Sequence, residues 1–136
     1  MRVYLDSSVF LSASLQNSPV SKAARRVLIG AGRRNFEAVT SVLAWDELVW
    51  IVKRKAGLLV ALEEGRKFLK LPGIEVENVS LKTVSFAQDA ARNFNLDPRD
   101  ALHVASAFEA SCDVFVSTDS DFKRVKGLKL KGVESF

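Results

Sequence analysis

The sequence contains one cysteine, one histidine and no long apolar run. A single cysteine, Cys112, cannot form an internal disulfide, and it excludes a zinc site built from several thiolates. No apolar run approaches the roughly 18 residues that suggest a membrane span. The apolar start that ends at Asp6 is also too short for the core of a signal peptide. We therefore expect a cytoplasmic protein with no membrane partner.

Internal repeats, low-complexity tracts and interdomain linkers are also absent from the sequence. A chain of 136 residues has the length of one ordinary domain, so we expect a single domain over residues 1–136. The hydrophobic share of 48% and the charged share of 26% are typical of a globular protein that builds its own core.

Basic residues outnumber acidic ones, which gives a net charge of +4 and a pI near 9.4. The lysines and arginines form small clusters, and each cluster by itself is most simply a solvated helix face. Together with the acidic positions described below, however, a basic surface around an acidic pocket suits a phosphodiester substrate.

Strand-like and helix-like segments alternate along the chain. Strands are expected over 2–5, 36–40, 74–77 and 113–117, with one or two more in 128–136; helices are expected after Ser18-Pro19, over 41–55 and 58–70, after Ser80 and over 98–111. The segment 74–77 alternates apolar and polar residues, as expected for a strand near a sheet edge. This order predicts an α/β fold, specifically a three-layer α/β/α sandwich with a mainly parallel central sheet.

Acidic residues occur where an apolar segment stops or a helix begins: Asp6, Asp100, Asp119 and Asp121. In an α/β protein these positions converge on one rim of the sheet. Carboxylates gathered there repel one another unless a cation binds between them, which predicts a divalent-metal site.

Each of these residues also has a simpler interpretation. Asp6 could cap the next helix, and Asp119 could belong to an ordinary turn. Asp100 could interact only with the dipole of its helix, but Asp97 is expected to fill the capping role and to leave Asp100 free to face the sheet edge.

A fourth carboxylate is expected on the helix over 41–55, where Asp46 and Glu47 both have apolar neighbours one turn away. Spacing alone does not choose between them. His103 follows Asp100 by one helical turn, but hard oxygen donors select Mg²⁺ or Mn²⁺. His103 is therefore expected to pack beside the site rather than to bind metal. The aromatic residues, including Trp50, are most simply core, or a self-association surface where they are exposed.

Four ordered segments carry a resemblance to a known family: VYLDSSVFL, TSVLAWDEL, DPRDALHVASA and VFVSTDSDF. Over essentially its whole length the chain resembles the PIN-domain ribonucleases, most closely the VapC-type toxins of prokaryotic toxin–antitoxin pairs. The resemblance places the catalytic and metal-binding acidic quartet of that family on Asp6, Glu47, Asp100 and Asp119. It thereby selects Glu47 over Asp46.

The resemblance also implies roles for residues around the quartet. Asp121 stands where the family often has an additional acidic metal ligand. Ser7 and Ser117 match small hydroxyl residues beside the site, although threonine is more usual at the position of Ser117. The family has no catalytic histidine, which agrees with a supporting role for His103.

The function implied is hydrolysis of RNA phosphodiester bonds with Mg²⁺ or Mn²⁺, in a homodimer that an antitoxin protein inhibits. Arg99, Lys123 and Arg124 stand near the motifs and are candidates for phosphate contacts. Two alternatives remain open. One is a catalytically idle PIN-like module that only binds; the other is a phosphoacceptor signalling domain, which would need a lysine at the end of a late strand.

Overall fold

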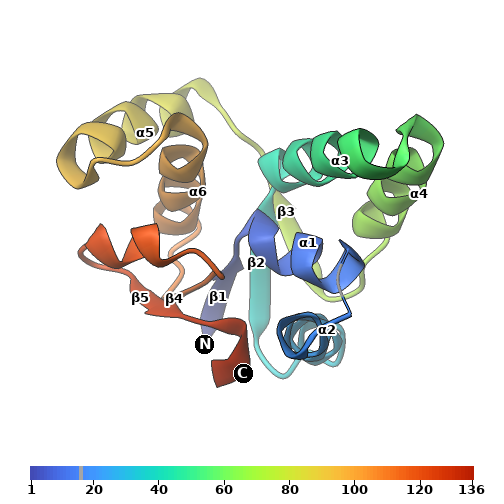
Figure 1. Ribbon diagram of the computed structural model, residues 1–136. Coiled ribbons are helices and arrows are strands. Elements are labelled where there is room, and N and C mark those ends of the chain that lie inside the picture. Colours follow the sequence, from blue (N-terminus) through green and yellow to red (C-terminus); the bar gives the residue numbers. More distant parts are fainter. Residues whose placement is uncertain (16) are drawn as a thin grey trace.

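Five parallel strands form the central sheet, in the order β3-β2-β1-β4-β5 (Figure 1). The computed structural model describes residues 1–15 and 17–136. The strands are β1 (Arg2–Leu5), β2 (Glu37–Ser41), β3 (Ile74–Glu77), β4 (Val114–Val116) and β5 (Lys129–Lys131). They confirm the expected strands to within one or two residues at each end. The alternating strand β3 lies at a sheet edge, as its pattern predicts.

Six α-helices and two short 3-10 helices accompany the strands in the described part of the chain. They are α1 (Ser7–Leu15), α2 (Pro19–Gly32), α3 (Val42–Ala56), α4 (Leu58–Leu69), α5 (Leu81–Phe94), α6 (Pro98–Glu109), η1 (Ser120–Arg124) and η2 (Val133–Ser135). The sequence pattern did not delimit α1, because serines share its buried positions with apolar residues and no continuous apolar stripe results. The other α-helices lie where the periodicity predicts them.

Hydroxyl caps explain several helix starts. Ser18 and Ser80 each form a capping box, and the Ser41 hydroxyl accepts a hydrogen bond from the backbone of α3. Asp97 is the N-cap residue of α6, as expected, and its backbone carbonyl accepts the first helical hydrogen bond, but its side chain makes no capping hydrogen bond. Asp97 is exposed, so water can satisfy the free amide groups of the first turn.

The helices cover both faces of the sheet. Along β1, Val3 and Leu5 point to one face and pack in a core that includes residues of α1 to α4. Tyr4 points to the other face and packs with residues of α5 and α6. Figure 1 shows these helices on opposite sides of the strands. The three-layer α/β/α sandwich is therefore confirmed, with a sheet that is parallel throughout.

The connections create a switch point between β1 and β4. From β1 the chain moves through α1 and α2 to β2 and then outward to β3, and α5 and α6 carry it back to β4 on the other side of β1. The backbone amide of Asp6 donates to the carbonyl of Val116 at 3.0 Å, which ties the two strand ends together. In open α/β sheets, ligands bind at the carboxyl ends of strands at such a point.

None of the helices in the described ranges combines the length and the apolar character that crossing a bilayer requires.

Candidate active site

Asp6 follows β1 and is buried at the switch point. Its Oδ2 accepts hydrogen bonds from the hydroxyls of Ser8 and Ser117, each at 2.8 Å. Ser117 belongs to the segment after β4, so this bond fixes the distance between two strand ends. The side chain of Asp6 is thus directed to neighbouring hydroxyls rather than to the backbone of α1.

Asp119 follows β4 at the rim of the sheet, and it also has the structural role of a turn residue. Its Oδ1 accepts from the backbone amide of Asp121 at 2.9 Å and caps η1, while its own amide donates to the Ser117 hydroxyl at 3.0 Å. Asp121 turns away toward Arg124, with 3.5 Å between the charged atoms, and is about half exposed. Asp121 therefore stands outside the buried part of the cluster.

The structure distinguishes Glu47 from its neighbour Asp46. Asp46 is exposed, whereas the carboxylate of Glu47 points inward and both of its oxygens are hydrogen-bonded. Oε2 accepts from the hydroxyl of Ser7 at 3.0 Å, and Oε1 lies 2.5 Å from Nε2 of His103. Burial works to raise the pKa of Glu47, but the hydrogen bond and charge of His103 outweigh it and lower that pKa.

His103 is fully buried between the sheet and the carboxylates. Because an ionised carboxylate can only accept, Nε2 carries the proton shared with Glu47. Nδ1 lies 2.7 Å from the hydroxyl of Tyr4, and Nε2 is 3.7 Å from Asp6. Burial works to lower the pKa of His103, but the bond to Glu47 and the nearby negative charges raise it. The result is a buried ion pair that links β1, α3 and α6.

Asp100 is the one member of the quartet that receives no hydrogen bond from any described residue. Burial, followed by the negative charges of Asp6 and Asp119, raises the pKa of Asp100 to about 6. The four carboxylates, which are far apart in the sequence, therefore lie close enough for their charges to interact. Such a cluster is stabilised by a bound cation.

The donor chemistry of the cluster fits Mg²⁺ or Mn²⁺, which prefer oxygen ligands. Over residues 1–15 and 17–136, no three His, Cys, Asp or Glu side chains stand in an arrangement that by itself could hold a metal ion. Mg²⁺ does not require such a cage, because it usually keeps several waters and is held by one or two carboxylates with substrate phosphates. The raised pKa of Asp100 is the observation that marks a place for positive charge.

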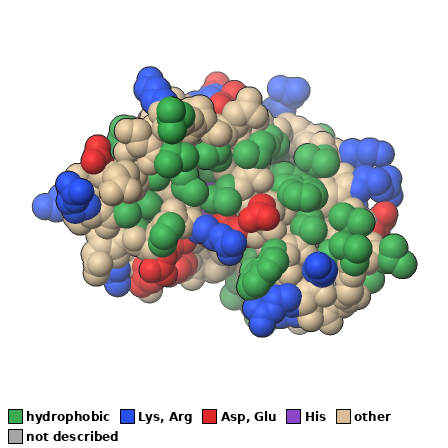
Figure 2. All heavy atoms as spheres, turned by 90° about the horizontal axis from the view of Figure 1, so that it is seen from above, with side chains coloured by type: hydrophobic (Ala, Val, Ile, Leu, Met, Phe, Trp, Pro, Cys, Tyr) green, Lys and Arg blue, Asp and Glu red, His purple; other side chains and the backbone are tan. Residues whose placement is uncertain are grey.

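The basic residues expected to meet phosphate occupy different positions. Arg99 extends over the ring of Trp50 on α3, and Lys123 lines a pocket of about 350 Å³ together with Asp119. Arg124 donates to the carbonyl of Asn95 at 2.7 Å as well as pairing with Asp121. Figure 2 shows acidic side chains in the middle of the face seen from above, with Lys or Arg beside them and hydrophobic side chains around them.

Sequence reasoning missed Tyr4 and treated Trp50 as a residue of the core or of a self-association surface. Tyr4 meets His103 across 99 sequence positions, and no spacing rule links them. For Trp50 a local signal exists, since Arg54 follows it by one turn on the same helix and lies over its ring.

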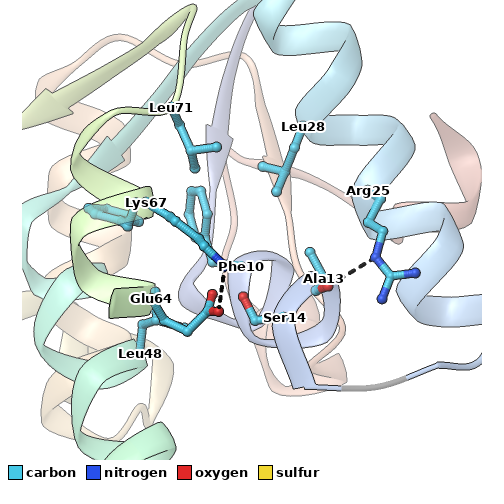
Figure 3. A pocket seen from close by; sticks show the side chains of 10 residues that line it. Phe10, Ala13, Ser14, Arg25, Leu28, Leu48, Glu64, Lys67 and Leu71 are labelled. Carbon is cyan, nitrogen blue, oxygen red and sulfur yellow. Dashed lines mark hydrogen bonds and ion pairs between the residues drawn. The ribbon is translucent and has the colours of Figure 1, made fainter. Parts of the chain in front are cut away.

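A second pocket, of about 340 Å³, lies in the layer of helices α1 to α4 (Figure 3). Phe10 and Phe68 form its apolar floor, with ring centroids 5.0 Å apart. At its edge Lys67 pairs with Glu64 at 3.2 Å, as the dashed line in Figure 3 shows. None of the four clustered carboxylates lines this pocket.

Comparison with known proteins gives one family and several similar folds. The model of the family described as "PIN domain" matches residues 3–128. VapBC2 from Rickettsia felis, bound to a promoter DNA fragment, is 17% identical with a TM-score of 0.75, covering 97% of this chain and 98% of its own. VapC20 from Mycobacterium tuberculosis, a toxin that cleaves the sarcin–ricin loop, is 15% identical with a TM-score of 0.76, covering 93% and 97%. DNA-bound VapBC from Salmonella typhimurium is 14% identical with a TM-score of 0.72, covering 98% of each chain. No curated protein matches the sequence.

Proposed function

The chain belongs to the PIN domain family, and we propose that it is a ribonuclease that hydrolyses RNA phosphodiester bonds with the help of Mg²⁺ or Mn²⁺. The observation that carries the proposal is the convergence of four sequence-distant carboxylates at the β1/β4 switch point of a basic protein. A phosphodiester is polyanionic, so acidic residues at its binding site require a cation between them and the substrate.

Asp6, Asp100 and Asp119 are the residues that we assign to holding or orienting the cation, with Asp121 as an auxiliary acid. A bound divalent cation supplies Lewis-acid chemistry: it makes water more acidic and stabilises charge on phosphoryl oxygens. The protein's own contribution is to hold the carboxylates in place. Ser117 does this by bonding to Asp6 from the end of β4.

We assign Glu47 one of two roles: it binds the metal, or it orients the attacking water. Its contacts support the second role better. Ser7 and His103 each bond to one of its oxygens, so its direction is fixed without a metal. Its pKa is lowered, so it stays ionised at neutral pH and can orient water by accepting a hydrogen bond from it. His103 and Tyr4 behind it then act as positioning residues.

The proposal includes the role of toxin in a toxin–antitoxin pair, with an antitoxin partner and a homodimeric state in the cytoplasm. It is supported by the similarity of the whole chain to VapBC toxin–antitoxin structures. A small DNA-binding protein encoded directly upstream, whose co-expression abolishes cleavage, is the expected finding. Sedimentation of the purified chain checks the dimer. A chain that stays monomeric at all concentrations contradicts the proposed homodimer.

The alternatives have less support. The phosphoacceptor domains of flavodoxin-like type have the strand order 2-1-3-4-5, whereas the order here is 3-2-1-4-5. Incubation with a small phosphoryl donor should leave this protein unmodified. A catalytically idle PIN-like module would bind RNA without cleaving it, and all four carboxylates of the quartet are present here.

The direct test is cleavage of structured and single-stranded RNA by the purified chain in Mn²⁺ or Mg²⁺. Asp100→Asn and Glu47→Gln should each lower the rate by at least about 100-fold. Asp46→Asn is the matched control, because it removes the neighbouring but exposed carboxylate, and it should cleave at the parental rate. Cleavage that persists in Asp100→Asn and in chelator would falsify the proposal.

A further inference from the structure

Trp50 is a large aromatic side chain that the core of the protein does not use. It lies on α3, one turn after Glu47, and 46% of its surface is exposed. The buried positions of the same helix include Leu48 and Val52, which pack against the sheet. The exposed part of the indole is an aromatic surface that a ligand can reach.

Two arginines from different helices lie over this indole. The guanidinium carbon of Arg54, one turn further along α3, is 4.7 Å from the ring centroid, and that of Arg99, at the start of α6, is 5.8 Å away. The contact with Arg99 joins elements that are far apart in the sequence. It brings positive charge and an aromatic ring to one place.

The positive charge of this pair is available to a ligand. In the part of the chain that the structure describes, no ion pair joins Arg54 or Arg99 to a carboxylate. Lys55 adds a further cation, and with Arg54 and Trp50 it lines a surface pocket of about 320 Å³. An unneutralised basic pocket with an aromatic wall suits an anion that carries a flat ring.

Arg99 connects this indole to the carboxylate cluster, because it lies over the ring from the first turn of α6, where Asp100 also stands. Arg99 directly precedes Asp100, and its charge contributes to the lowered pKa of Glu47. A chain of nucleotides that places a phosphate at the carboxylates therefore has its neighbouring nucleotide beside Trp50.

We propose that Trp50, Arg54 and Arg99 form a subsite for single-stranded RNA, next to the phosphate that is cleaved. An unpaired base stacks on the exposed part of the indole, and the two guanidinium groups neutralise the phosphates that flank it. The inference rests on the proposed ribonuclease function and adds a mode of substrate recognition. Because every base has a π face, the subsite selects unpaired over paired RNA rather than a particular base.

The experiment measures binding of a labelled, unpaired oligoribonucleotide, about 10 nucleotides long, to the full chain carrying Asp100→Asn, so that no cleavage occurs. Trp50→Ala in this background should weaken binding about tenfold or more, while Trp50→Phe keeps an aromatic face and stays within about threefold of the parent. The same sequence in a duplex should bind more weakly to the parent, and Trp50→Ala should reduce that difference.

The arginines are tested by charge-matched variants. Arg54→Gln and Arg99→Gln should each weaken binding and reduce the slope of log affinity against log salt by about 0.7, the value for one phosphate contact on a single strand. Arg26→Gln, which removes an exposed arginine of α2, should leave affinity and slope close to those of the parent.

Intrinsic fluorescence provides a second readout. RNA should quench the emission of the parent, and Trp50→Phe, which keeps only Trp45, should lose this quenching. This measurement also tests whether RNA stacks on Trp50 if Trp50→Ala folds poorly.

The inference is overturned if Trp50→Ala binds RNA as the parent does, or if Arg26→Gln loses as much affinity as Arg54→Gln. It is also overturned if Trp50→Ala changes the oligomeric state in sedimentation and loses affinity only in step with it, since the indole then belongs to a contact between copies. A chain that neither binds nor cleaves RNA contradicts the proposed function itself. If the parent binds and cleaves RNA and Trp50→Ala binds it equally well, only the proposed subsite is contradicted.

Discussion

Glu47 and His103 show how single residues keep a buried charge in this protein. Removing one partner of a buried ion pair leaves the other charged and without compensation, which costs far more than the pair contributes as a whole. Here the pair is extended on one side by Ser7 and on the other by Tyr4, so each polar atom of the imidazole has a neighbour. The direction of Glu47 therefore depends on the residues that bond to it and on Tyr4 behind the imidazole.

His103→Ala should lower the free energy of unfolding by about 3 kcal/mol, because it leaves a cavity and an unpaired buried carboxylate. Tyr4→Phe removes only one hydroxyl and should cost about 1 kcal/mol. Urea denaturation measures both values. The double variant His103→Ala with Glu47→Ala should lose less than the sum of the two single variants, since neither residue then has a partner to leave behind. If the double variant loses as much stability as the two single variants together, Glu47 and His103 are not energetically coupled.

At the scale of elements, two glycines with positive φ join successive elements, but only one of them lies at a close approach between elements. Gly57 joins α3 to α4 at φ +90°, and a Cβ built there meets nothing within 4 Å. Gly73 joins α4 to β3 at φ +74°, and a Cβ there would lie 2.1 Å from the carbonyl oxygen of Ala31 in α2. Only the second glycine sets the spacing between elements.

Gly73→Ala should destabilise the fold by about 3 kcal/mol or more, because backbone atoms of α2 must move to admit the methyl group. Gly57→Ala meets no neighbouring atom, but its backbone at φ 90° and ψ 169° is in a region nearly restricted to glycine, so it should cost about 2 kcal/mol. The two free energies of unfolding are compared in the same denaturant. Equal losses at both positions would show that backbone conformation, rather than the close approach to α2, accounts for the effect.

At the scale of the whole molecule, the fold gathers negative charge on one rim of a chain whose net charge is positive. The mutual repulsion of these carboxylates works against the stability of the fold. The folded-state pKa of Asp100, about 6, exceeds the ordinary value near 4 of a free carboxyl. Between those two values the folded protein binds more protons than the unfolded chain, so its stability falls as the pH rises and stays low above about pH 6.

In chelator, stability should therefore decrease by about 1–2 kcal/mol between pH 4 and pH 7 through Asp100, allowing for solvent screening at a partly buried position. Asp100→Asn should remove this part of the dependence and be more stable than the parent at pH 7. His103, whose pKa is also raised, contributes in the same direction, and Asp100→Asn keeps most of that part, because Glu47 and Asp6 raise the pKa of His103 more than Asp100 does. Thermal unfolding over this pH range measures the difference.

Mn²⁺ at ten times its dissociation constant should restore about 1.4 kcal/mol to the parent at pH 7 and far less to Asp100→Asn. An equal gain in both proteins would place the cation elsewhere on the surface.

Much of the fold could be predicted from the sequence because its signals are local. The apolar run before Asp6, the proline after Ser18 and the alternation of 74–77 each reflect neighbours a few residues apart. The helix α1 was not delimited, because buried serines at its core positions hide the apolar stripe. Asp97 was correctly placed as the N-cap of α6, but the sequence could not show that its side chain makes no capping hydrogen bond, because an Asp side chain that caps and one that is solvated look alike in sequence.

The sequence by itself determined the strand–helix order, the parallel sheet and the presence of acidic residues at strand and helix ends, since periodicity and chain connectivity dictate these. Only the tertiary structure decided that Asp46 is exposed while Glu47 is bonded to His103, that Tyr4 lies behind the imidazole and that Arg99 reaches Trp50. The reason is physical: burial and Coulomb interactions depend on distances through space, and those distances exist only once the layers have packed.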